Sequence, residues 1–363
     1  MPPRLELRRL QKSFDEVRAV RDLSLALGRG EFVSLLGPSG CGKSTTLAMI
    51  AGFESPTAGE ILVDGVVVNR LPPQRRRIGL VFQDYAVFSR MTVRGNLAFG
   101  LAARGVGRAQ RRERVEAMAA KLGLIDILDR GGDRLNMSEM QRVALGRVLL
   151  TEPELVLLDE PMSNLDAALR ATLRGELKQI QRELGQTVLY VTHDQLEAMS
   201  MSDRIAIMKD GEILQFATPD EIYDRPCNRF VAEFIGDPPI NVVACDVAVS
   251  GAAVAASTAL HSGLDLGRRA IAAGRHLLAF RPHDVEIAER PGPGSAAATV
   301  RFVETLGAES VFHVDHGGEM IRVVGPPDAA AADATVHLTL RRDRLLLIES
   351  GSDRVVPAAA VAS

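Results

Sequence analysis

One short stretch of the chain combines glycines, a lysine and adjacent hydroxyl side chains in the pattern G-x-x-x-x-G-K-[ST]. It consists of Gly37, Pro38, Ser39, Gly40, Cys41, Gly42, Lys43, Ser44 and Thr45. Because glycine has no side chain, such a loop can wrap closely around a polyphosphate and direct several backbone N–H groups at it. The pattern predicts that Lys43 reaches the β- and γ-phosphates and that the Ser44 hydroxyl holds Mg²⁺. These residues therefore predict a site for a nucleoside triphosphate.

The segments on either side of this loop are those that a phosphate site requires. Residues 31–36 are predicted to form a short buried strand, and residues 46–51 a helix that ends near Gly52. The positive end of the helix dipole then faces the phosphates. This context argues against a chance glycine-rich turn. Kinases, GTPases, helicases and transport ATPases all share such a loop, so other residues must distinguish them.

Two carboxylates, Asp159 and Glu160, follow an apolar strand predicted at 155–158. Open α/β sheets bind their ligands at the carboxyl ends of the strands, so both side chains are expected near the nucleotide. Asp159 is predicted to hold Mg²⁺ directly or through water, and Glu160 to orient or deprotonate the attacking water. The pair could instead cap the next helix, but the phosphate loop in the same chain favours the catalytic role.

His193 and Gln83 also follow predicted strands, at 187–192 and 78–82, and should reach the same edge of the sheet. A neutral His193 imidazole could hydrogen-bond the γ-phosphate and the catalytic glutamate. The amide of Gln83 could contact Mg²⁺ or the attacking water. A lone histidine would not support a functional role, but the position of His193 one strand beyond the carboxylate pair favours it.

The elements that position these residues change in character along the chain. Strands alternate with helices through the first part, which predicts a mostly parallel sheet covered on both faces. Residues 92–147 have a helical pattern throughout and read as an insert. Beyond residue 236, short β-like segments alternate with alanine- and glycine-rich turns, which predicts a small barrel or sandwich.

Length and composition limit the remaining possibilities. The chain has 363 residues, which is long for one domain and suggests two. Its formal net charge is −3, which gives no support for a nucleic-acid-binding surface. Its three cysteines lie far apart and show neither metal-ligand spacing nor a disulfide framework. We expect neither a signal peptide, because charges stand where its apolar core belongs, nor a membrane span, because no apolar run approaches about 18 residues.

The motifs occur in the order used by ATP-binding-cassette (ABC) ATPases, and residues 4–235 resemble that family. The series comprises the phosphate loop, the strand-end Gln83, the helical insert, Leu157-Leu158-Asp159-Glu160-Pro161, Ser163-Asn164-Leu165-Asp166 and Thr192-His193-Asp194. The resemblance implies that the cofactors are ATP and Mg²⁺. It also implies a P-loop, RecA-like α/β fold with a helical insert. GTPases and kinases lack this order of motifs.

The resemblance also assigns roles to single residues. Glu160, His193 and Gln83 correspond to the catalytic glutamate, the switch histidine and the glutamine that reaches the metal. Considered alone, Phe14 could equally well be a core residue or an aromatic that stacks on a base. The resemblance assigns it to the aromatic that stacks on adenine. Asp166 corresponds to the aspartate that follows the catalytic strand and contacts the nucleotide site.

The part after residue 236 is similar to the C-terminal extension of ATPase subunits in bacterial solute importers, above all those for maltose and glycerol phosphate. The similar segments are 230–236, Asn241, Arg281-Pro282 and 303–307. The resemblance implies an all-β, OB-like regulatory domain that helps dimerisation. We therefore expect an ATPase domain at 1–235, with a helical subdomain at about 92–150, and a regulatory domain at 236–363.

One motif departs from the family pattern. Family members carry L-S-G-G-Q, which caps the γ-phosphate bound by the opposite subunit, and this chain has Leu135-Asn136-Met137-Ser138-Glu139 there. Met137 and Ser138 add side chains where glycines allow close approach, and Glu139 adds a negative charge. Asn136 and Ser138 can still donate hydrogen bonds to ATP. Either the chain works as a homodimer with a variant signature, or it pairs with a different ATPase subunit.

The function indicated by the motifs and the resemblance is ATP hydrolysis coupled to uptake of a sugar, polyol or glycerol-phosphate-like solute. The expected partners are membrane-spanning permease subunits and, indirectly, a solute-binding protein, with no nucleic acid. The chain is then a peripheral subunit on the cytoplasmic face of the inner membrane. Alternatives are an importer ATPase for polyamines or iron, and a soluble ABC ATPase of translation or DNA repair. A generic P-loop kinase would leave Gln83 and His193 unexplained.

Overall fold

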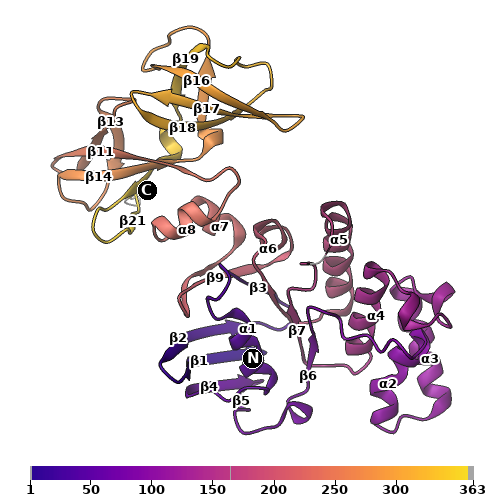
Figure 1. The fold of residues 1–363 in the computed structure, drawn as a ribbon. Coiled ribbons are helices and arrows are strands. Elements are labelled where there is room, and N and C mark those ends of the chain that lie inside the picture. The colour runs from indigo at the N-terminus through magenta and orange to yellow at the C-terminus, as the bar shows by residue number, and fades with distance from the viewer. Residues whose placement is uncertain (1, 164, 359–363) are drawn as a thin grey trace. The chain divides into compact units, whose positions relative to one another are not determined.

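A computed structural model describes residues 2–163 and 165–358. The chain divides after Pro219 into two compact units, which are considered separately below. The first unit holds all of the nucleotide-related motifs, and the second is the β-rich part (Figure 1). The domain boundary expected at residue 235 stays a prediction, because this division assigns the two short helices before that residue to the second unit.

The centre of the first unit is a six-stranded, mostly parallel sheet. Its strands, in spatial order, are β10 (Glu212–Ala217), β9 (Arg204–Lys209), β3 (Phe32–Leu36), β8 (Val188–Thr192), β7 (Leu155–Asp159) and β6 (Ile78–Val81). Only β10 runs antiparallel to its neighbour. β3 and β8 are buried throughout, as expected of parallel strands that are covered on both faces. The registers Leu36↔Thr192 and Asp159↔Val191 bring the carboxyl ends of β3, β7 and β8 to one edge.

A second, antiparallel sheet packs beside the first one. It consists of β2 (Val17–Leu27), β1 (Leu5–Phe14), β4 (Ala58–Val63) and β5 (Val66–Val67). Alternate leucines of β1 and β2 enter a buried cluster together with apolar residues of β3 and of the first helix. The hairpin formed by β1 and β2 turns at Asp15 and Glu16, so Phe14 lies at its tip.

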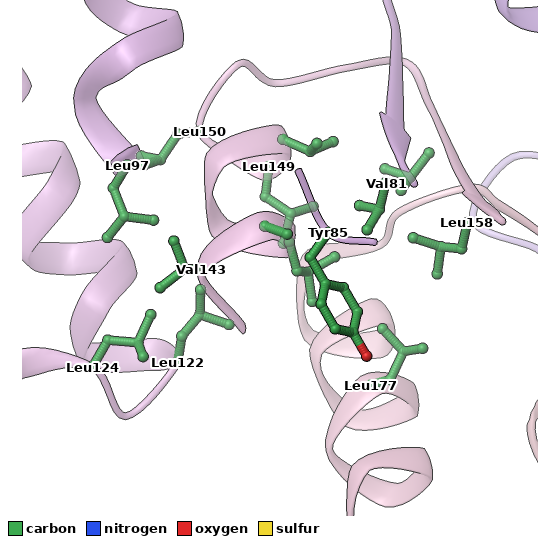
Figure 2. Packing of buried hydrophobic residues seen from close by; sticks show 14 of the residues in the cluster. Val81, Tyr85, Leu97, Leu122, Leu124, Val143, Leu149, Leu150, Leu158 and Leu177 are labelled. Carbon is green, nitrogen blue, oxygen red and sulfur yellow. The ribbon is translucent and has the colours of Figure 1, made fainter. Parts of the chain in front are cut away.

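Six longer helices complete the first unit. They are α1 (Lys43–Ala51), α2 (Val93–Ala103), α3 (Arg108–Lys121), α4 (Met137–Leu149), α5 (Ala167–Leu184) and α6 (Gln195–Met201). Single 3₁₀ turns lie at Pro73–Arg75, Ile125–Ile127 and Gly132–Arg134. Figure 2 shows how Leu97, Leu122 and Val143 from the helical part share a buried cluster with Val81 and Leu158 of the sheet. This shared core joins the helical insert to the nucleotide edge.

The second unit is an all-β domain preceded by two short helices, α7 (Pro219–Asp224) and α8 (Arg229–Phe234). One sheet has the order β13 (Leu264–Arg268), β12 (Ala253–Ser257), β11 (Asn241–Ser250), β14 (Gly274–Phe280), β20 (Leu346–Ile348) and β21 (Val355–Val356). The other has the order β15 (Val285–Ala288), β19 (Thr335–Leu340), β16 (Ala296–Thr305), β17 (Ser310–His316) and β18 (Glu319–Gly325). 3₁₀ turns occupy Pro282–Asp284 and Arg342–Arg344.

The two sheets of the second unit enclose a common core. Leu278 and Phe280 from the first sheet and Phe312 and Leu338 from the second belong to one buried cluster. Buried Arg281 fastens the preceding helices, because its guanidinium donates to the Ala232 carbonyl at 3.0 Å. The predicted fold class, an α/β unit with a helical insert followed by an all-β domain, is confirmed. In the described parts of the chain, no helix has both the length and the apolar character needed to cross a membrane.

Candidate functional site

The phosphate loop joins the end of β3 to the start of α1, as predicted. Lys43 is the first residue of α1 and is buried, and its Nζ donates to the carbonyls of Gly37 at 2.8 Å and Pro38 at 3.0 Å. The ammonium group is thus held inside the curve of the loop. Ser39, Gly40 and Ser44 are exposed, and so lie where a ligand can reach them.

Two glycines of the loop are required by close approach of other backbone segments. A Cβ on Gly37 would lie 2.3 Å from the carbonyl oxygen of Met208, and one on Gly42 would lie 2.4 Å from that of Ala19. Gly42 also has a φ of 102°, in the region that favours glycine. Any larger side chain at either position would push β9 or β2 away and open the loop.

Ser44 and Asp159 come together at the carboxyl edge of the sheet. The Ser44 hydroxyl donates to Asp159 Oδ1 at 3.4 Å. A hydroxyl and a carboxylate are hard oxygen ligands of the kind that Mg²⁺ prefers. Burial, and then repulsion from Glu160, raise the pKa of the Asp159 carboxyl, while Ser44 and Lys43 oppose the rise. A bound divalent cation would relieve this unfavourable charge, so the residues present fit a magnesium site.

Glu160 and His193 form the second contact at this edge. His193 Nδ1 lies 3.1 Å from Glu160 Oε2, so the imidazole and the carboxylate share a hydrogen bond. The side chain of His193 is half exposed, and that of Glu160 is 22 % exposed. Glu160 has a positive φ of 44°, and its N–H donates to the Val191 carbonyl at 2.9 Å. The backbone turn therefore aims the carboxylate away from the strand and toward His193.

Gln83 is joined to the same cluster through Ser163. Its Nε2 donates to Ser163 Oγ at 3.1 Å, and Ser163 Oγ donates to the Glu160 carbonyl at 3.0 Å. The structure therefore brings Gln83, Ser44, Asp159, Glu160 and His193 to one edge, although they are up to 149 positions apart. Ser163 was not predicted as a site residue, because its partner is set by the turn after β7.

Four other predicted site residues, Phe14, Asp166, Asn136 and Ser138, are not part of the cluster at the sheet edge. Phe14 is 43 % exposed at the tip of the β1–β2 hairpin, with the Lys12 ammonium 4.5 Å from its ring centroid. Asp166 is exposed and caps α5, because its Oδ1 accepts the Leu169 N–H at 2.9 Å. Asn136 and Ser138 start α4. Among the described residues, none of these four hydrogen-bonds the phosphate loop.

The variant signature forms a capping box at the start of α4. Asn136 Oδ1 accepts the Glu139 N–H at 2.9 Å, and Glu139 Oε2 accepts the Asn136 N–H at 3.0 Å. The second Glu139 oxygen pairs with Arg130 at 2.9 Å. The carboxylate is thus turned back onto its own helix and partly neutralised. Met137 and Ser138, at the first two helical positions, are left with the N–H groups that an external acceptor could use.

Two aromatic residues that follow Gln83 have different surroundings. Tyr85 is only 2 % exposed, and Figure 2 shows its ring inside the cluster near Val81 and Leu177. Its hydroxyl donates to the Pro161 carbonyl at 2.7 Å, and burial raises its pKa to about 12. Phe88, by contrast, is 37 % exposed and lies against Phe99, with ring centroids 4.7 Å apart.

Comparison with known proteins identifies the family. Residues 20–163 match the family model described as ABC transporter, and residues 278–348 match the model described as TOBE domain. A solved structure from Clostridium perfringens, described as part of the ABC transporter complex cbiONQ, aligns with a TM-score of 0.58 at 29% identity. The alignment covers 61% of this chain and 91% of that one.

Curated relatives are similar along most of the chain. The xylose/arabinose import ATP-binding protein of Haloferax volcanii is 44% identical, covering 94% of this chain and 90% of the relative. The trehalose/maltose import ATP-binding protein of Thermococcus litoralis is 45% identical, covering 85% and 87%. The sn-glycerol-3-phosphate import ATP-binding protein of Rhizobium etli is 42% identical, covering 95% and 97%. The chain therefore belongs to the ATP-binding subunits of ABC transporters, in the group that contains these import proteins.

Proposed function

We propose that this chain hydrolyses ATP as the motor subunit of an ABC importer for a sugar, polyol or glycerol-phosphate-like solute. One observation carries the catalytic part, namely the Glu160–His193 contact beside Ser44 and Asp159 at the mouth of the phosphate loop. The solute class rests on the names of the relatives, which act on pentoses, trehalose or maltose, and glycerol 3-phosphate.

Each residue of the edge has a task that its position supports. The loop from Gly37 to Thr45 would surround the β- and γ-phosphates with N–H groups, and Phe14, exposed at the tip of the β1–β2 hairpin, would stack on the adenine. Mg²⁺, held by Ser44 and Asp159 with Gln83 close by, would supply positive charge that offsets the phosphate oxygens.

Glu160 is the residue proposed to act on water. Its carboxylate would accept a hydrogen bond from the water and hold it in line with the γ-phosphorus, taking up the proton as the oxygen attacks. His193 would donate to the γ-phosphate through Nε2, and its Nδ1 would accept a hydrogen bond from the Glu160 carboxyl once that group has taken up the proton from water. The reaction releases ADP and phosphate, and the proton leaves through Glu160.

Two ATP-binding subunits are proposed to close around two nucleotides, with α4 of one subunit facing the phosphates of the other. ATP drives closure only if it binds the closed dimer more tightly than the open one. The partner is either a second copy or a different ATP-binding subunit. The capping box at Asn136 and Glu139 is compatible with both, because Met137 and Ser138 keep N–H groups for a phosphate.

The membrane-spanning permease is proposed to dock beside the segment that follows Gln83. Phe88, Phe99 and Met91 are exposed there, and Arg147 lies 4.9 Å from the Phe88 ring centroid. Arg147 also donates to the carbonyls of Tyr85 and Ala86, so movement of Gln83 can be passed to this apolar surface. Docking there places the chain peripherally on the cytoplasmic face of the membrane, with a solute-binding protein on the far side.

Affinity purification from native membranes tests this function. We expect permease subunits to co-purify with the tagged chain, and ATPase activity in vesicles to rise when the solute-binding protein and its sugar or glycerol phosphate are added. A Phe99→Ser variant should lose the permease while keeping nucleotide binding. Recovery with ribosomes or DNA instead would contradict the importer function, and stimulation only by a polyamine or iron would contradict the solute class.

A further inference from the structure

A buried carboxylate next to His193 has no task in the proposed reaction. Glu197 lies on α6 and is 2 % exposed, and its Oε2 accepts two hydroxyl groups. Tyr190 Oη is 2.8 Å from it and Thr192 Oγ1 is 2.6 Å. Both hydroxyls come from β8, the strand that leads directly to His193. Glu197 therefore ties the end of this strand to the helix that follows.

Two further contacts close a ring of hydrogen bonds around the backbone of His193. Thr192 Oγ1 accepts the Asp194 N–H at 3.0 Å, and Asp194 Oδ1 accepts the Glu197 N–H at 3.1 Å. His193 lies between Thr192 and Asp194, so the residues on both sides of it are held by Glu197. The ring therefore fixes the backbone from which the imidazole reaches Glu160.

The ring is also connected to the helix that follows the catalytic strand. Arg170 on α5 donates to Asp194 Oδ2 at 3.0 Å. Asp166, for which the family resemblance implies a nucleotide contact, caps the same helix one turn earlier. A shift of α5 would therefore reach Asp194, and through it the backbone of His193.

The hydrogen-bond pattern shows that Glu197 Oε2 is the acceptor for both hydroxyls. Thr192 Oγ1 already accepts from Asp194, so its own hydrogen is directed at the carboxylate, and Tyr190 donates to the same oxygen. Burial raises the pKa of the Glu197 carboxyl, while the two hydroxyls and Arg170 oppose the rise. An apolar residue here would leave the buried hydroxyls of Tyr190 and Thr192 without their acceptor, so the carboxylate organises the end of β8 next to His193.

We propose that Glu197 is a positioning residue that sets the His193 imidazole against Glu160. It touches neither water nor phosphate and acts through the backbone on both sides of the histidine. The inference rests on the proposed ATPase function, since it concerns the orientation of a residue assigned to that reaction. If this is correct, substitutions that break the hydrogen-bond ring around the His193 backbone should lower the rate of hydrolysis and leave ATP affinity unchanged.

The test uses variants of the full chain that keep side-chain shape. Thr192→Val removes the hydroxyl shared by Glu197 and Asp194, and Glu197→Leu removes the acceptor. Either should lower kcat by about 10- to 100-fold, the effect of displacing a catalytic group by about 1 Å. The KM for ATP should stay within about twofold. Glu197→Gln, which keeps one oxygen acceptor, should restore most of the rate.

A matched control comes from another buried hydroxyl at the same helix. Ser34 Oγ lies 2.6 Å from Ser202 Oγ, at the end of α6 away from His193, and Ser34 is fully buried. Ser34→Ala should lose similar stability and keep kcat. If Thr192→Val and Ser34→Ala lower the rate equally, or if Glu197→Leu keeps full activity, the positioning role is refuted.

A second measurement separates this inference from the proposed function. The chain has 7 histidines, so ¹⁵N-histidine spectra of the nucleotide-free protein can report on His193, assigned by its absence in His193→Gln. Thr192→Val should move the His193 ring resonances and leave the other six in place. An unchanged His193 signal would overturn the inference. A wild-type chain without ATPase activity, both alone and with a second ATP-binding subunit, would refute the proposed function, and this spectrum would still test the hydrogen-bond ring around His193.

Discussion

Replacing Glu139 by glutamine changes the variant signature in one respect only, its charge. The side-chain amide of glutamine has an oxygen that can accept the Asn136 N–H in place of the carboxylate oxygen, so the capping box at the start of α4 is retained. The ion pair with Arg130 is lost. The Glu139→Gln variant therefore separates the stability supplied by the carboxylate from its effect on a bound anion.

The cost in stability follows from the exposure of the pair. The Arg130 side chain is 41 % exposed and that of Glu139 is 13 % exposed, so their ion pair contributes about 0.5 kcal/mol. The negative charge at the helix N-terminus contributes about another 0.5 kcal/mol. We expect the variant to lose about 1 kcal/mol, which lowers Tm by about 2–4 °C for a domain of this size.

The effect on hydrolysis should have the opposite sign. Like charges near a protein surface repel by a few kcal/mol at about 4 Å, and Arg130 screens part of this. Removing the carboxylate should therefore stabilise a γ-phosphate facing α4 and raise kcat/KM about five- to tenfold, which corresponds to about 1–1.4 kcal/mol. Steady-state phosphate release at several ATP concentrations measures this, and differential scanning fluorimetry measures Tm.

The control removes a comparable ion pair from the same helical part of the molecule. Glu116 on α3 pairs with Arg94 at 3.3 Å and, in the described part of the chain, makes no hydrogen bond or ion pair with the signature. Arg94 keeps its other partner Asp129, so Glu116→Gln should change Tm slightly and leave hydrolysis unaffected. A well-folded Glu139→Gln variant with unchanged or lower kcat/KM would refute the reasoning. It would then follow that α4 does not face a phosphate in the active assembly.

Further predictions concern single residues of the first unit. The pKa of Asp159 is raised by burial, so its favourable contribution to stability is present below its ordinary pKa of about 4 and is lost as pH rises through the higher folded value. The Asp159→Asn variant should therefore be more stable than the wild type by about 0.5–1 kcal/mol at pH 7 and equally stable near pH 3.5, as thermal melts would measure. It should also lose Mg²⁺-dependent turnover. Phe14→Ala should raise the Kd for ATP about 5- to 50-fold, and Phe14→Trp should restore it, as a fluorescent nucleotide would report. Buried Arg76 donates to the carbonyls of Met49 and Ile50 at the end of α1. Arg76→Met should therefore lower the free energy of unfolding, measured in urea, by about 3 kcal/mol. It should leave the ATP concentration at half-maximal rate unchanged.

The cluster at the sheet edge was predictable because parallel strands bring their carboxyl ends together. Asp159 and His193 each follow a run of apolar residues, and that pattern alone places them near the loop that precedes Lys43. The glycine spacing predicts a loop that wraps around a phosphate, but the close approach of the Met208 and Ala19 carbonyls to Gly37 and Gly42 depends on the neighbouring strands and could not be predicted from it.

Other features depend on three-dimensional contacts that the sequence pattern does not reveal. Tyr85 and Ala86 have positive φ angles of 59° and 44°, and this turn directs the Tyr85 ring into the core rather than to the surface. Glu197 has the spacing of a helix-capping glutamate after Asp194, yet its side chain turns to Tyr190 and Thr192. Buried carboxylates are rare, so composition and periodicity predict such a residue to be exposed.

The Asn136-x-x-Glu139 spacing could have been recognised from the sequence as a capping box, which begins many helices. The same four residues align with the family signature, in which glycines occupy the positions of Met137 and Ser138. The structure explains how α4 begins without those glycines, because the two side chains satisfy each other's N–H groups.

Mg²⁺-dependent ATP hydrolysis by the purified chain, over a range of protein concentrations, tests the central claim most directly. If the partner is a second copy, the account predicts turnover that increases more than linearly with protein concentration and is abolished by Glu160→Gln, while that variant still binds ATP. Turnover that survives Glu160→Gln, or that needs no Mg²⁺, would contradict the assignment of Glu160 and Asp159. Tight ATP binding without any turnover until a second ATP-binding subunit is added would contradict the homodimer and favour a mixed pair.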